Sequence, residues 1–583
     1  MELLSALNPG IVLIIAGLIA CLVPQQRVRQ ALVLAAPVLG LVLLALATRG
    51  VDLAPASVLG LDLSLYRVDR LGYIFALAFL IAAVLNAVYA LHSDDRLQDG
   101  TALIYAGGAV GAALSGDLVT LFVFWEITAV SSVFLIFRAS TQAAYNAGMR
   151  YLAIQILSGV LLLDGIAYVY KYTGSLSLEA FSSFDAPGAK YVFVAFAIKA
   201  AFPLVHNWLH DAYPKASIVG AVVLSAFTTK LAVYAFARMF PGFETLIIIG
   251  AVMAVFPLLF TVLENDLRRV LSYALNSQIG FMICAIGVGT PLALNGAAAH
   301  AFACTIYMGL LFMAIGAVLQ RTGSAKVTDL GGLWASMPWT TLACLFGALS
   351  IAALPLTNGF AAKALTMGAL SKEGHSFAWL ALTFASAGVV LHAGLKVPYA
   401  AFFAPRKAVD RAVVVREAPF NMLLAMGLAA LICIATGLPS FVPGFGYDWL
   451  YGLLPEPDSA KGYTLFTLGH VLTQLQLLSV AALVFMLAKR FGIYPNEVPS
   501  TILDTDWLYR KPGYGLAMWS GTVWAKLGPA LTGLAGTLSG RAFSRLEAAF
   551  SPRGTLARGG LTSGMAIWST VLLGVVMLVV LLS

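Results

Sequence analysis

The chain has 583 residues, of which 60% are hydrophobic and 11% are charged, and its mean hydropathy is +0.89. Soluble globular proteins carry about 25% charged residues, so this composition excludes a water-soluble protein and indicates one that crosses a membrane many times. The net charge of +8 is consistent with basic membrane loops and requires no nucleic-acid partner. The five cysteines lie in apolar runs without CxxC spacing, which argues against disulfide frameworks, iron–sulfur sites and structural zinc.

Apolar runs of about 20 residues, the length that crosses a bilayer as a helix, follow one another along almost the whole chain. We therefore predict an all-α polytopic membrane protein with about 14–16 transmembrane helices. Alternate loops differ in their Lys and Arg content, and the bias places the N-terminus outside the cell. The candidate spans lie near residues 10–24, 30–48, 71–91, 101–116, 118–137, 148–170, 189–206, 217–238, 243–263, 270–289, 293–319, 339–370, 376–403, 418–440, 467–488 and 564–582.

The stretch 191–238 contains two apolar segments, each with one lysine near its middle, Lys199 and Lys230. A lysine at bilayer depth costs roughly 2.5–3.5 kcal/mol on insertion scales, so such residues usually have a function. Pro203 removes the backbone donor that would reach the carbonyl of Lys199, and a broken helix at membrane depth is tolerated only against protein or a water-filled cavity. We predict a broken helix beside an ion path; the alternative for Lys199 is a side chain that extends to the membrane interface.

A second stretch has the same organisation. Pro355 interrupts an apolar segment, Lys363 follows it, and Lys396 lies in the next span. Lys199 and Lys230 are 31 residues apart, and Lys363 and Lys396 are 33 apart. Interrupted segments at matching positions in two halves indicate a transporter built from repeats. Lys396 lies close to a proline and could instead extend to the interface.

This comparison predicts two repeats of five segments, each with one broken helix. An odd number of segments in a repeat makes the second copy inverted relative to the first. The expected order is N-terminal transmembrane helices (1–100), the first repeat (101–240), the second, inverted repeat (243–403), C-terminal helices (404–488), a basic amphipathic segment on the cytoplasmic face that lies on the membrane or docks a partner (489–563), and a last span (564–583).

Glu126 is the one carboxylate in the apolar run LVTLFVFWEITAVSSVFLIF. A carboxylate at this depth needs a cation nearby or stays protonated. We predict that Glu126 pairs with Lys199, and that opening the pair lowers the pKa of the lysine so that it releases a proton. The alternative is a static ion pair that holds two helices together.

His300 lies in an apolar run between the two halves, and histidine can relay protons near neutral pH. The predicted path is therefore Lys199, Lys230, His300 and Lys363, although a lone histidine can also be a hydrogen-bonded core residue. Polar residues that could assist are His206, His210, Asp211, Gln278, His392 and Lys396. No Walker, GxGxxG, haem or flavin motif is found, so we expect no cofactor, no metal and no enzyme active site.

These residues resemble the antiporter-like membrane subunits shared by respiratory complex I and the Mrp multisubunit cation/proton antiporters. The resemblance covers roughly residues 60–440. It assigns the family's glutamate to FVFWEITAVSS, its pumping lysine to AIKAAFPLVHNWLHDAYPKAS, its relay lysine to SAFTTKLAVYAFAR, its histidine to AAHAFACTIYMGLLF and its terminal charged residue to PLTNGFAAKALT. These motifs place the roles at Glu126, Lys199, Lys230, His300 and Lys363.

A lysine at position 363 and the C-terminal extension are similar to the D-type branch of the Mrp antiporter subunits. The resemblance implies a proton-translocating subunit of a multisubunit Na⁺/H⁺ antiporter in the bacterial inner membrane, assembled with other membrane subunits. His210 stands where the family usually has proline, and Gln278 where some members have histidine, which puts the proton route in doubt. Alternatives are a proton-pumping subunit of a complex I-like oxidoreductase or membrane hydrogenase, a structural subunit without transport, and the membrane half of a bicarbonate-uptake complex.

Overall fold

A computed structural model describes residues 7–58, 60–405, 415–440, 442 and 444–495, together with 504–505, 507, 509–513, 515–523 and 573. The chain divides into two units, residues 1–502 and 503–583. In the second unit the described residues include a π-helical turn, η6 (Tyr509–Gly513), and a helix over 515–523. Most of the expected surface segment 489–563 and nearly all of the last span lie outside the described residues, so those two expectations stay predictions.

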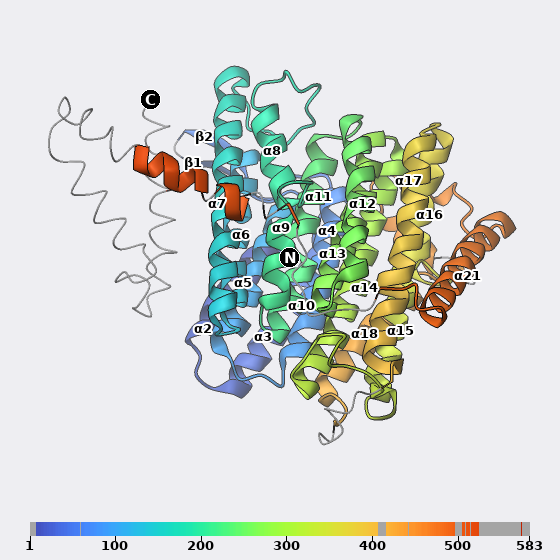
Figure 1. Cartoon of the computed structure of the whole chain (residues 1–583). Coiled ribbons are helices and arrows are strands. Elements are labelled where there is room, and N and C mark those ends of the chain that lie inside the picture. The colour runs from blue at the N-terminus through green and yellow to red at the C-terminus, as the bar shows by residue number, and fades with distance from the viewer. Residues whose placement is uncertain are drawn as a thin grey trace. The chain divides into compact units, whose positions relative to one another are not determined.

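The first unit is helical, and ten of its described helices are long and apolar enough to cross a membrane (Figure 1). Shorter apolar helices cover Pro9–Leu22, Pro338–Ile351 and Phe420–Ala435. The predicted all-α multi-pass fold is confirmed. Its first part contains α2 (Pro9–Leu22), α3 (Gln26–Leu46), α4 (Arg70–Ala90), α5 (Arg96–Ala113), α6 (Leu118–Phe137), α7 (Gln142–Thr173), α8 (Ala189–Lys199), α9 (Asn207–Ala212), η1 (Tyr213–Lys215), α10 (Ile218–Ala226) and α11 (Thr228–Met239).

The second part crosses the membrane five times, as residues 101–240 do, when the two pieces of a broken helix are counted as one crossing. In both stretches the fourth crossing is the broken one. The elements of the second part are α12 (Thr245–Leu263), α13 (Leu267–Val288), α14 (Pro291–Thr322), η2 (Leu333–Ala335), α15 (Pro338–Ile351), α16 (Asn358–Lys372), α17 (Ser376–Val389), η3 (Val390–Lys396) and η4 (Tyr399–Phe403). Then follow α18 (Phe420–Ala435), α19 (Tyr447–Leu453), α20 (Pro457–Lys461) and α21 (Leu468–Arg490). The repeat and domain boundaries stay predictions.

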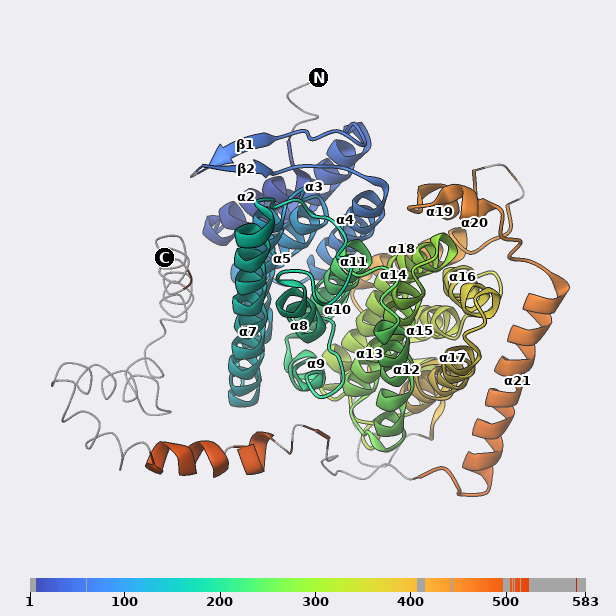
Figure 2. The ribbon, with the colours of Figure 1, turned by 90° about the horizontal axis from the view of Figure 1, so that it is seen from above.

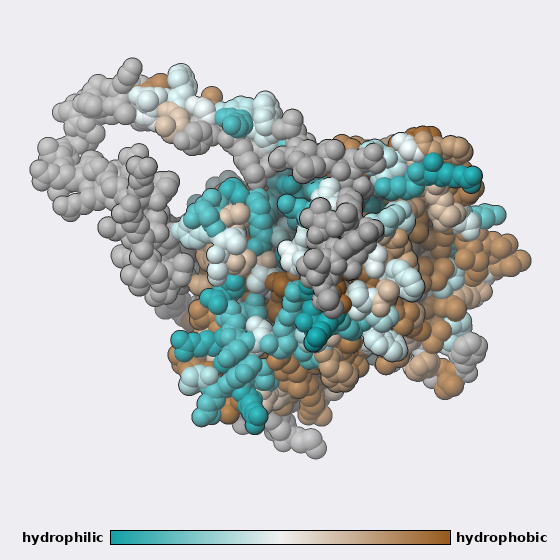
Figure 3. Space-filling view, turned by 60° about the horizontal axis from the view of Figure 1, so that its bottom comes forward, coloured by the Kyte–Doolittle hydropathy of each residue, from teal (hydrophilic) through white to brown (hydrophobic). Residues whose placement is uncertain are grey.

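The centre of the first unit is formed by α13 and α14, which bury residues on every face, as expected for helices that are apolar all round. In Figure 2, α14 lies between α10 on one side and α15 and α16 on the other, and it packs against all three. The two halves therefore share this central pair of helices. Figure 3 shows hydrophilic residues gathered on the end of the molecule that is turned forward, whereas the flank is mostly hydrophobic, as a lipid-facing belt requires.

The strands that the structure describes form one small hairpin of β1 (Pro55–Val58) and β2 (Leu61–Ser64), paired antiparallel. It lies in the connection between α3 and α4. Asp117, the N-cap of α6, accepts a hydrogen bond from the backbone of Ser64 at 2.9 Å. The hairpin thus covers the start of the helix that carries Glu126.

Both predicted helix breaks are present. The first separates α8 from α9 at Pro203, and the second separates α15 from α16 at Pro355. The backbone has the same form in both breaks, since each is closed by a hydrogen bond from a backbone N–H to the carbonyl oxygen five residues earlier. The bond runs from residue 202 to residue 197 in the first break (3.0 Å) and from residue 354 to residue 349 in the second (2.9 Å). Within the two breaks, four non-glycine residues have positive φ angles, and they form pairs 152 residues apart: Ala201 (59°) with Ala353 (59°), and Leu204 (74°) with Leu356 (78°).

This backbone register shows that the lysines of the two breaks are not equivalent. At the spacing of 152 residues, Lys199 corresponds to Ile351, and Lys363 corresponds to Asp211. Lys199 is the last residue before its break, whereas Lys363 lies within the helix that follows the other break. The two lysine pairs have similar spacing in the sequence, but their members do not occupy equivalent positions in the two breaks.

Two further irregularities were not predicted. The helix that carries Lys230 is interrupted at Phe227, between α10 and α11, without a proline or glycine at that position. The last span of the second half continues from α17 into two π-helical segments, η3 and η4, on either side of Pro398. Such segments often occur at functional sites.

Candidate functional site

Lys199 is fully buried, and its ammonium group is held by α6 rather than by a carboxylate. Its Nζ donates to the carbonyl oxygen of Trp125 and to Oγ1 of Thr128, both at 2.8 Å. The same nitrogen lies 4.0 Å from the centre of the Trp125 ring, a cation–π distance. Carbonyl, hydroxyl and ring thus supply the negative potential that a cation needs at this depth.

Glu126 and Lys199 form no direct ion pair among the residues that the structure describes, although the two groups interact electrostatically. Both of its carboxylate oxygens are buried without a hydrogen-bond partner. The carboxylate lies instead against Gly159 of α7, where a Cβ would stand only 1.8 Å from Oε1. The Lys199 ammonium binds the carbonyl of Trp125, the residue that precedes Glu126. We call this arrangement an open pair, because the two charged groups are close in the structure but not bonded to each other.

Lys230 lies in the first turn of α11, directly after the unpredicted interruption. Its Nζ donates to the carbonyl oxygen of Ser225 at 2.5 Å, a group near the end of α10. The Cys304 thiol on α14 is an electrostatic neighbour of this ammonium group. The interruption at Phe227 thus leaves the carbonyl oxygen of Ser225 available as an acceptor for Lys230, and α14 contributes the Cys304 thiol nearby.

His300 lies on α14, one turn from Cys304, and forms a closed network with two other side chains. Its Nε2 is 3.0 Å from Oε1 of Gln278 and 3.0 Å from the hydroxyl of Tyr307, and that hydroxyl donates to Gln278 at 3.1 Å. All of these residues are buried. Gln278 therefore occupies a position beside the histidine, as a hydrogen-bond partner.

Lys363 lies in α16, the helix that follows the second break. Its Nζ donates to the carbonyl oxygen of Ile351 at 2.8 Å, across the second helix break, and lies 5.2 Å from the centre of the Phe281 ring. The same ring meets the imidazole of His300 edge to face at 5.7 Å. Lys230, Cys304, His300 and Lys363 all lie in the buried centre of the unit, with the Phe281 ring between His300 and Lys363. The proton path through them stays a prediction.

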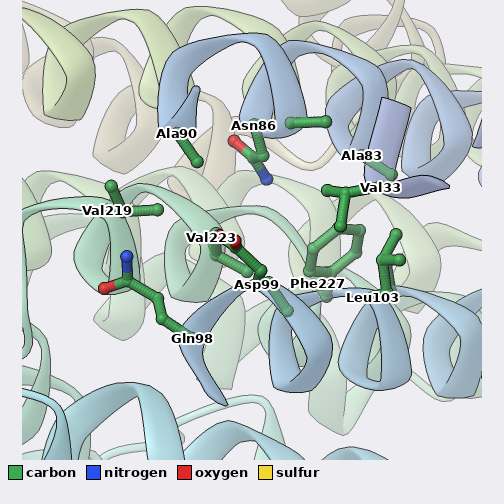
Figure 4. A pocket seen from close by; sticks show the side chains of 13 residues that line it. Val33, Ala83, Asn86, Ala90, Gln98, Asp99, Leu103, Val219, Val223 and Phe227 are labelled. Atoms are coloured by element: carbon green, nitrogen blue, oxygen red, sulfur yellow. The ribbon is translucent and has the colours of Figure 1, made fainter. Parts of the chain in front are cut away.

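Lys363 also borders a cavity of about 390 Å³ between α16, α17 and α21. A much smaller cavity, of about 20 Å³, lies among α3, α4, α5 and α10, where the side chain of Asn86 points toward the space (Figure 4). The Nδ2 atom of Asn86 is buried without a partner, and this volume holds about one water molecule. A further cavity, of about 530 Å³, lies beside the hairpin and the start of α6 and is lined by Asp62, Asp117 and Tyr170 among others.

Of the auxiliary residues, Gln278 bonds to His300, and the histidines and the aspartate next to the first break form a cluster of their own. His210 stacks on Tyr273 at 3.7 Å, and its ring lies 5.3 Å from that of His206. Asp211 forms ion pairs with Arg150 and Lys215, both at 2.6 Å. These contacts are those of a structural cluster next to the first break.

The two auxiliary residues of the last span also have structural contacts. Lys396 donates to the carbonyl oxygens of Thr261, Val262 and Glu264 at 2.9–3.0 Å and so caps the C-terminal end of α12. Nδ1 of His392 lies 3.4 Å from the hydroxyl of Tyr494. A cation at a helix C-terminus is favoured by the helix dipole, so the cap accounts for Lys396 without a transport role.

Sequence reasoning missed three residues. Cys304 and Tyr307 follow His300 at helical spacing, so the i, i+4, i+7 pattern on one face of α14 would have shown them. Asp164 was overlooked as an ionisable residue in the run 148–170; it lies on the outer stripe of α7 together with exposed Leu157 and Tyr168. In the described part of the chain, no group of three His, Cys, Asp or Glu residues could hold a metal ion.

Residues 115–388 match the protein family described as NADH:quinone oxidoreductase/Mrp antiporter, TM. The matching stretch makes up 47% of the chain. It contains Glu126, Lys199, Lys230, His300 and Lys363, so the resemblance on which the sequence interpretation rests is confirmed for the part of the chain that holds the candidate site.

Curated relatives include both antiporter and redox proteins. The D-type subunit of the Na(+)/H(+) antiporter from Alkalihalophilus pseudofirmus is 33% identical over 296 residues, 47% of this chain and 60% of the relative. Hydrogenase-4 component B of Escherichia coli is 27% identical over 420 residues, 65% of this chain and 62% of the relative. The N-type subunit of the NADH-quinone oxidoreductase from Desulforudis audaxviator is 30% identical over 317 residues, 50% of this chain and 63% of the relative. The matches thus span 60–63% of these relatives' lengths.

Two solved structures share the fold. One chain of the Mrp complex from Dietzia sp. DQ12-45-1b superimposes with a TM-score of 0.68 at 21% identity, covering 82% of this chain and 100% of that chain. A chain of the archaeal membrane-bound sulfane sulfur reductase superimposes with a TM-score of 0.69 at 20% identity, covering 98% and 99%. This chain therefore shares its fold with one chain of each of these two membrane complexes.

Proposed function

We propose that this chain is the proton-translocating subunit of a multisubunit monovalent cation/H⁺ antiporter, with Na⁺ as the cation, in the bacterial inner membrane. The observation that carries the proposal is the group of buried ionisable residues Lys230, His300 and Lys363 in the centre of the unit, where the Phe281 ring lies between His300 and Lys363. The relation to the D-type protein of an Na(+)/H(+) antiporter supports the choice of cation. Na⁺ itself would cross elsewhere in the complex, with other membrane subunits as partners.

Each lysine on this path is held by backbone carbonyl groups instead of a carboxylate, which leaves its charge only partly compensated in a low-dielectric setting. A lysine in such a setting can give up its proton at modest cost, and the neighbouring group accepts it. Protons would enter from the cytoplasm near Lys230 and His300, cross this group of buried residues and leave through the second half. Movement of the Lys199 ammonium from the Trp125 carbonyl to the Glu126 carboxylate would close the open pair and gate the transfer.

The direct test is antiport in inverted membrane vesicles that contain the whole complex. Glu126→Ala and Lys199→Ala should each abolish Na⁺-driven proton movement, whereas Lys190→Ala, which changes an exposed lysine of the same segment, should not. Immunoblots of the complex confirm that the variants assemble. Wild-type antiport in both site variants would exclude this function for the Glu126–Lys199 pair.

A second candidate is a proton-pumping membrane subunit of a redox complex, such as a complex I-like oxidoreductase or a membrane hydrogenase. It is favoured by the structural match to the sulfane sulfur reductase, which extends over 98% of this chain, against 82% for the Mrp complex. Purification in mild detergent separates the two. Small antiporter subunits in the isolated complex support the first function, and iron–sulfur or hydrogenase subunits support the second.

A further inference from the structure

Between its two ends, α7 carries one ionisable side chain on its outward face. Asp164 belongs to a stripe of residues that follow one another at helical spacing and are exposed or half-buried, Ala153, Leu157, Val160, Asp164 and Tyr168. The opposite face of α7 packs against α6 and α8. Figures 1 and 2 both show α7 at the edge of the first unit. Asp164 therefore faces the surroundings of the unit and not its interior.

The neighbours along the helix place Asp164 within the membrane. Arg150 lies 14 residues before it and Lys171 lies 7 residues after it. At 1.5 Å per residue these two basic residues are about 32 Å apart, close to the thickness of the hydrocarbon core. Exposed Tyr168 stacks on exposed Tyr191 of α8 at 5.2 Å, and such aromatic residues mark the membrane interface. Asp164 lies one turn, about 6 Å, on the membrane side of Tyr168.

The chain itself offers Asp164 no cation. No ion pair or hydrogen bond joins it to any residue that the structure describes. The sequence of the expected last span, 564–582, contains no Lys, Arg or His. The basic segment 489–563 is predicted on the cytoplasmic face, whereas the loop charges place the end of α7 that follows Asp164 outside the cell. A cationic partner of Asp164 is therefore expected from another chain.

Lipid contact alone does not account for this side chain. The outward face of α12 has the composition that lipid favours, since it exposes Ile248, Val252 and Leu259. A carboxylate at membrane depth is unfavourable next to lipid, and such groups usually pair with a cation. Aspartate has a single methylene group, so it cannot extend to the interface as a lysine does. Charge complementarity thus indicates a basic side chain opposite Asp164.

We propose that this outward face of α7 binds a transmembrane helix of a different membrane subunit, and that a lysine or arginine of that helix forms an ion pair with Asp164. The small side chain of Ala153 lets a second helix approach closely, and Leu157 and Val160 supply apolar packing on the same stripe. The inference rests on the proposed function, because it requires a multisubunit complex. It adds the surface at which one partner binds and the charge that this partner carries.

The first test is the composition of the complete complex, purified in mild detergent through a tag on this chain. Asp164→Leu leaves the partner's cation without its carboxylate, so the other membrane subunits that co-purify should decrease at least about fivefold. Asp164→Glu keeps the charge and should retain them within about twofold. Asp185→Leu, the control, removes an exposed carboxylate of the following loop and should change nothing.

A carboxyl group that only faces lipid predicts the opposite result, because leucine is more favourable than aspartate in that environment. Wild-type composition in Asp164→Leu, or an equal loss in Asp164→Glu, would overturn the ion pair.

Photo-cross-linking identifies the partner and gives an answer even if Asp164→Leu fails to fold. Benzoylphenylalanine replaces Leu157, which is 52% exposed and lies two turns before Asp164, in membranes that contain the complete complex. We expect an adduct with another subunit, mapped by mass spectrometry to a transmembrane helix that contains a lysine or arginine. No protein adduct, an adduct with a second copy of this chain, or an adduct with a helix that lacks a basic residue would overturn the proposal.

The mapped basic residue then allows the two charges to be exchanged. Asp164→Arg alone should lose the partner, whereas Asp164→Arg together with replacement of the partner's basic residue by aspartate should restore co-purification to within about twofold of wild type. Failure to restore it would contradict a direct ion pair. Neither composition nor cross-linking requires ion transport, so this proposal can fail while the vesicle antiport assay succeeds, and the reverse.

Discussion

The two broken helices have the same backbone but different surroundings. At the first break, Lys199 is fully enclosed, bound by Trp125 and Thr128, with the Glu126 carboxylate left open nearby. At the second, Lys363 binds a freed carbonyl and borders a cavity of about 390 Å³. The same type of broken helix thus gives a lysine two different environments. An enclosed lysine next to a carboxylate suits the proposed gate, and a lysine beside a cavity suits exchange of protons with water.

The largest effect is expected from closing the space that Glu126 occupies. Gly159→Ala places a methyl group 1.8 Å from the position of Oε1, so the carboxylate must move away. Displacement of a reacting group by about 1 Å can lower a rate by up to about 100-fold, and we expect antiport in vesicles to fall by at least about tenfold.

The matched control and the rescue separate this effect from a packing defect. Gly165→Ala on the same helix meets a methyl group of Val192 at 2.6 Å and no ionisable group, so it should leave antiport within about twofold of wild type. Glu126→Asp, whose side chain is shorter by one methylene group, should restore part of the activity of Gly159→Ala. If the double variant is no better than Gly159→Ala alone, the glycine does not act through Glu126.

In the shared centre, Tyr307→Phe removes a hydroxyl group that bonds to both His300 and Gln278. Loss of two hydrogen bonds of about 0.7 kcal/mol each predicts a decrease in antiport of about tenfold. Tyr89→Phe is the control, since it removes a buried tyrosine hydroxyl that bonds α14 at Met313, away from His300 and Gln278. Equal loss in the two variants would indicate a general weakening of α14.

A smaller effect is expected at the first break from Thr128→Val, which removes one of the two oxygen acceptors of Lys199 at nearly constant shape. One hydrogen bond to a charged group is worth about 1.5–3 kcal/mol, part of which the remaining carbonyl retains, so we expect a change of about fivefold. Because the lysine is then held less tightly in its open position, the pH at which antiport is half-maximal should shift. A changed rate with an unaltered pH profile would mean that Thr128 only supports packing.

The smallest effect concerns the wall of the second cavity. Gln474→Leu leaves the carbonyl of Ala352 without its donor, and Gln476→Leu changes an exposed residue of the same helix. The cost of about 1–3 kcal/mol should lower the thermal unfolding temperature of the purified complex by about 2 °C in the first variant only. An unchanged temperature in Gln474→Leu would show that α21 is held by other contacts.

Most of the fold could be predicted, because apolar runs and prolines determine where helices cross the bilayer and where they break. The interruption at Phe227 could not, since no helix-breaking residue marks it. The partners of the lysines were also missed: Lys199, Lys230 and Lys363 bind carbonyl oxygens, which every residue has, so no side-chain pattern identifies them. The predicted Glu126–Lys199 contact came from charge alone, which does not distinguish a closed pair from an open one.

The cap that Lys396 forms on α12 has a consequence for biosynthesis. Three carbonyl groups at the end of α12 depend on a residue that lies 132–135 positions later in the chain. At about 5–20 residues per second, translation needs roughly 7–27 s to reach it. During this interval the end of the inserted helix lacks its native donor, so the second half can complete its packing only after its last helix has entered the membrane.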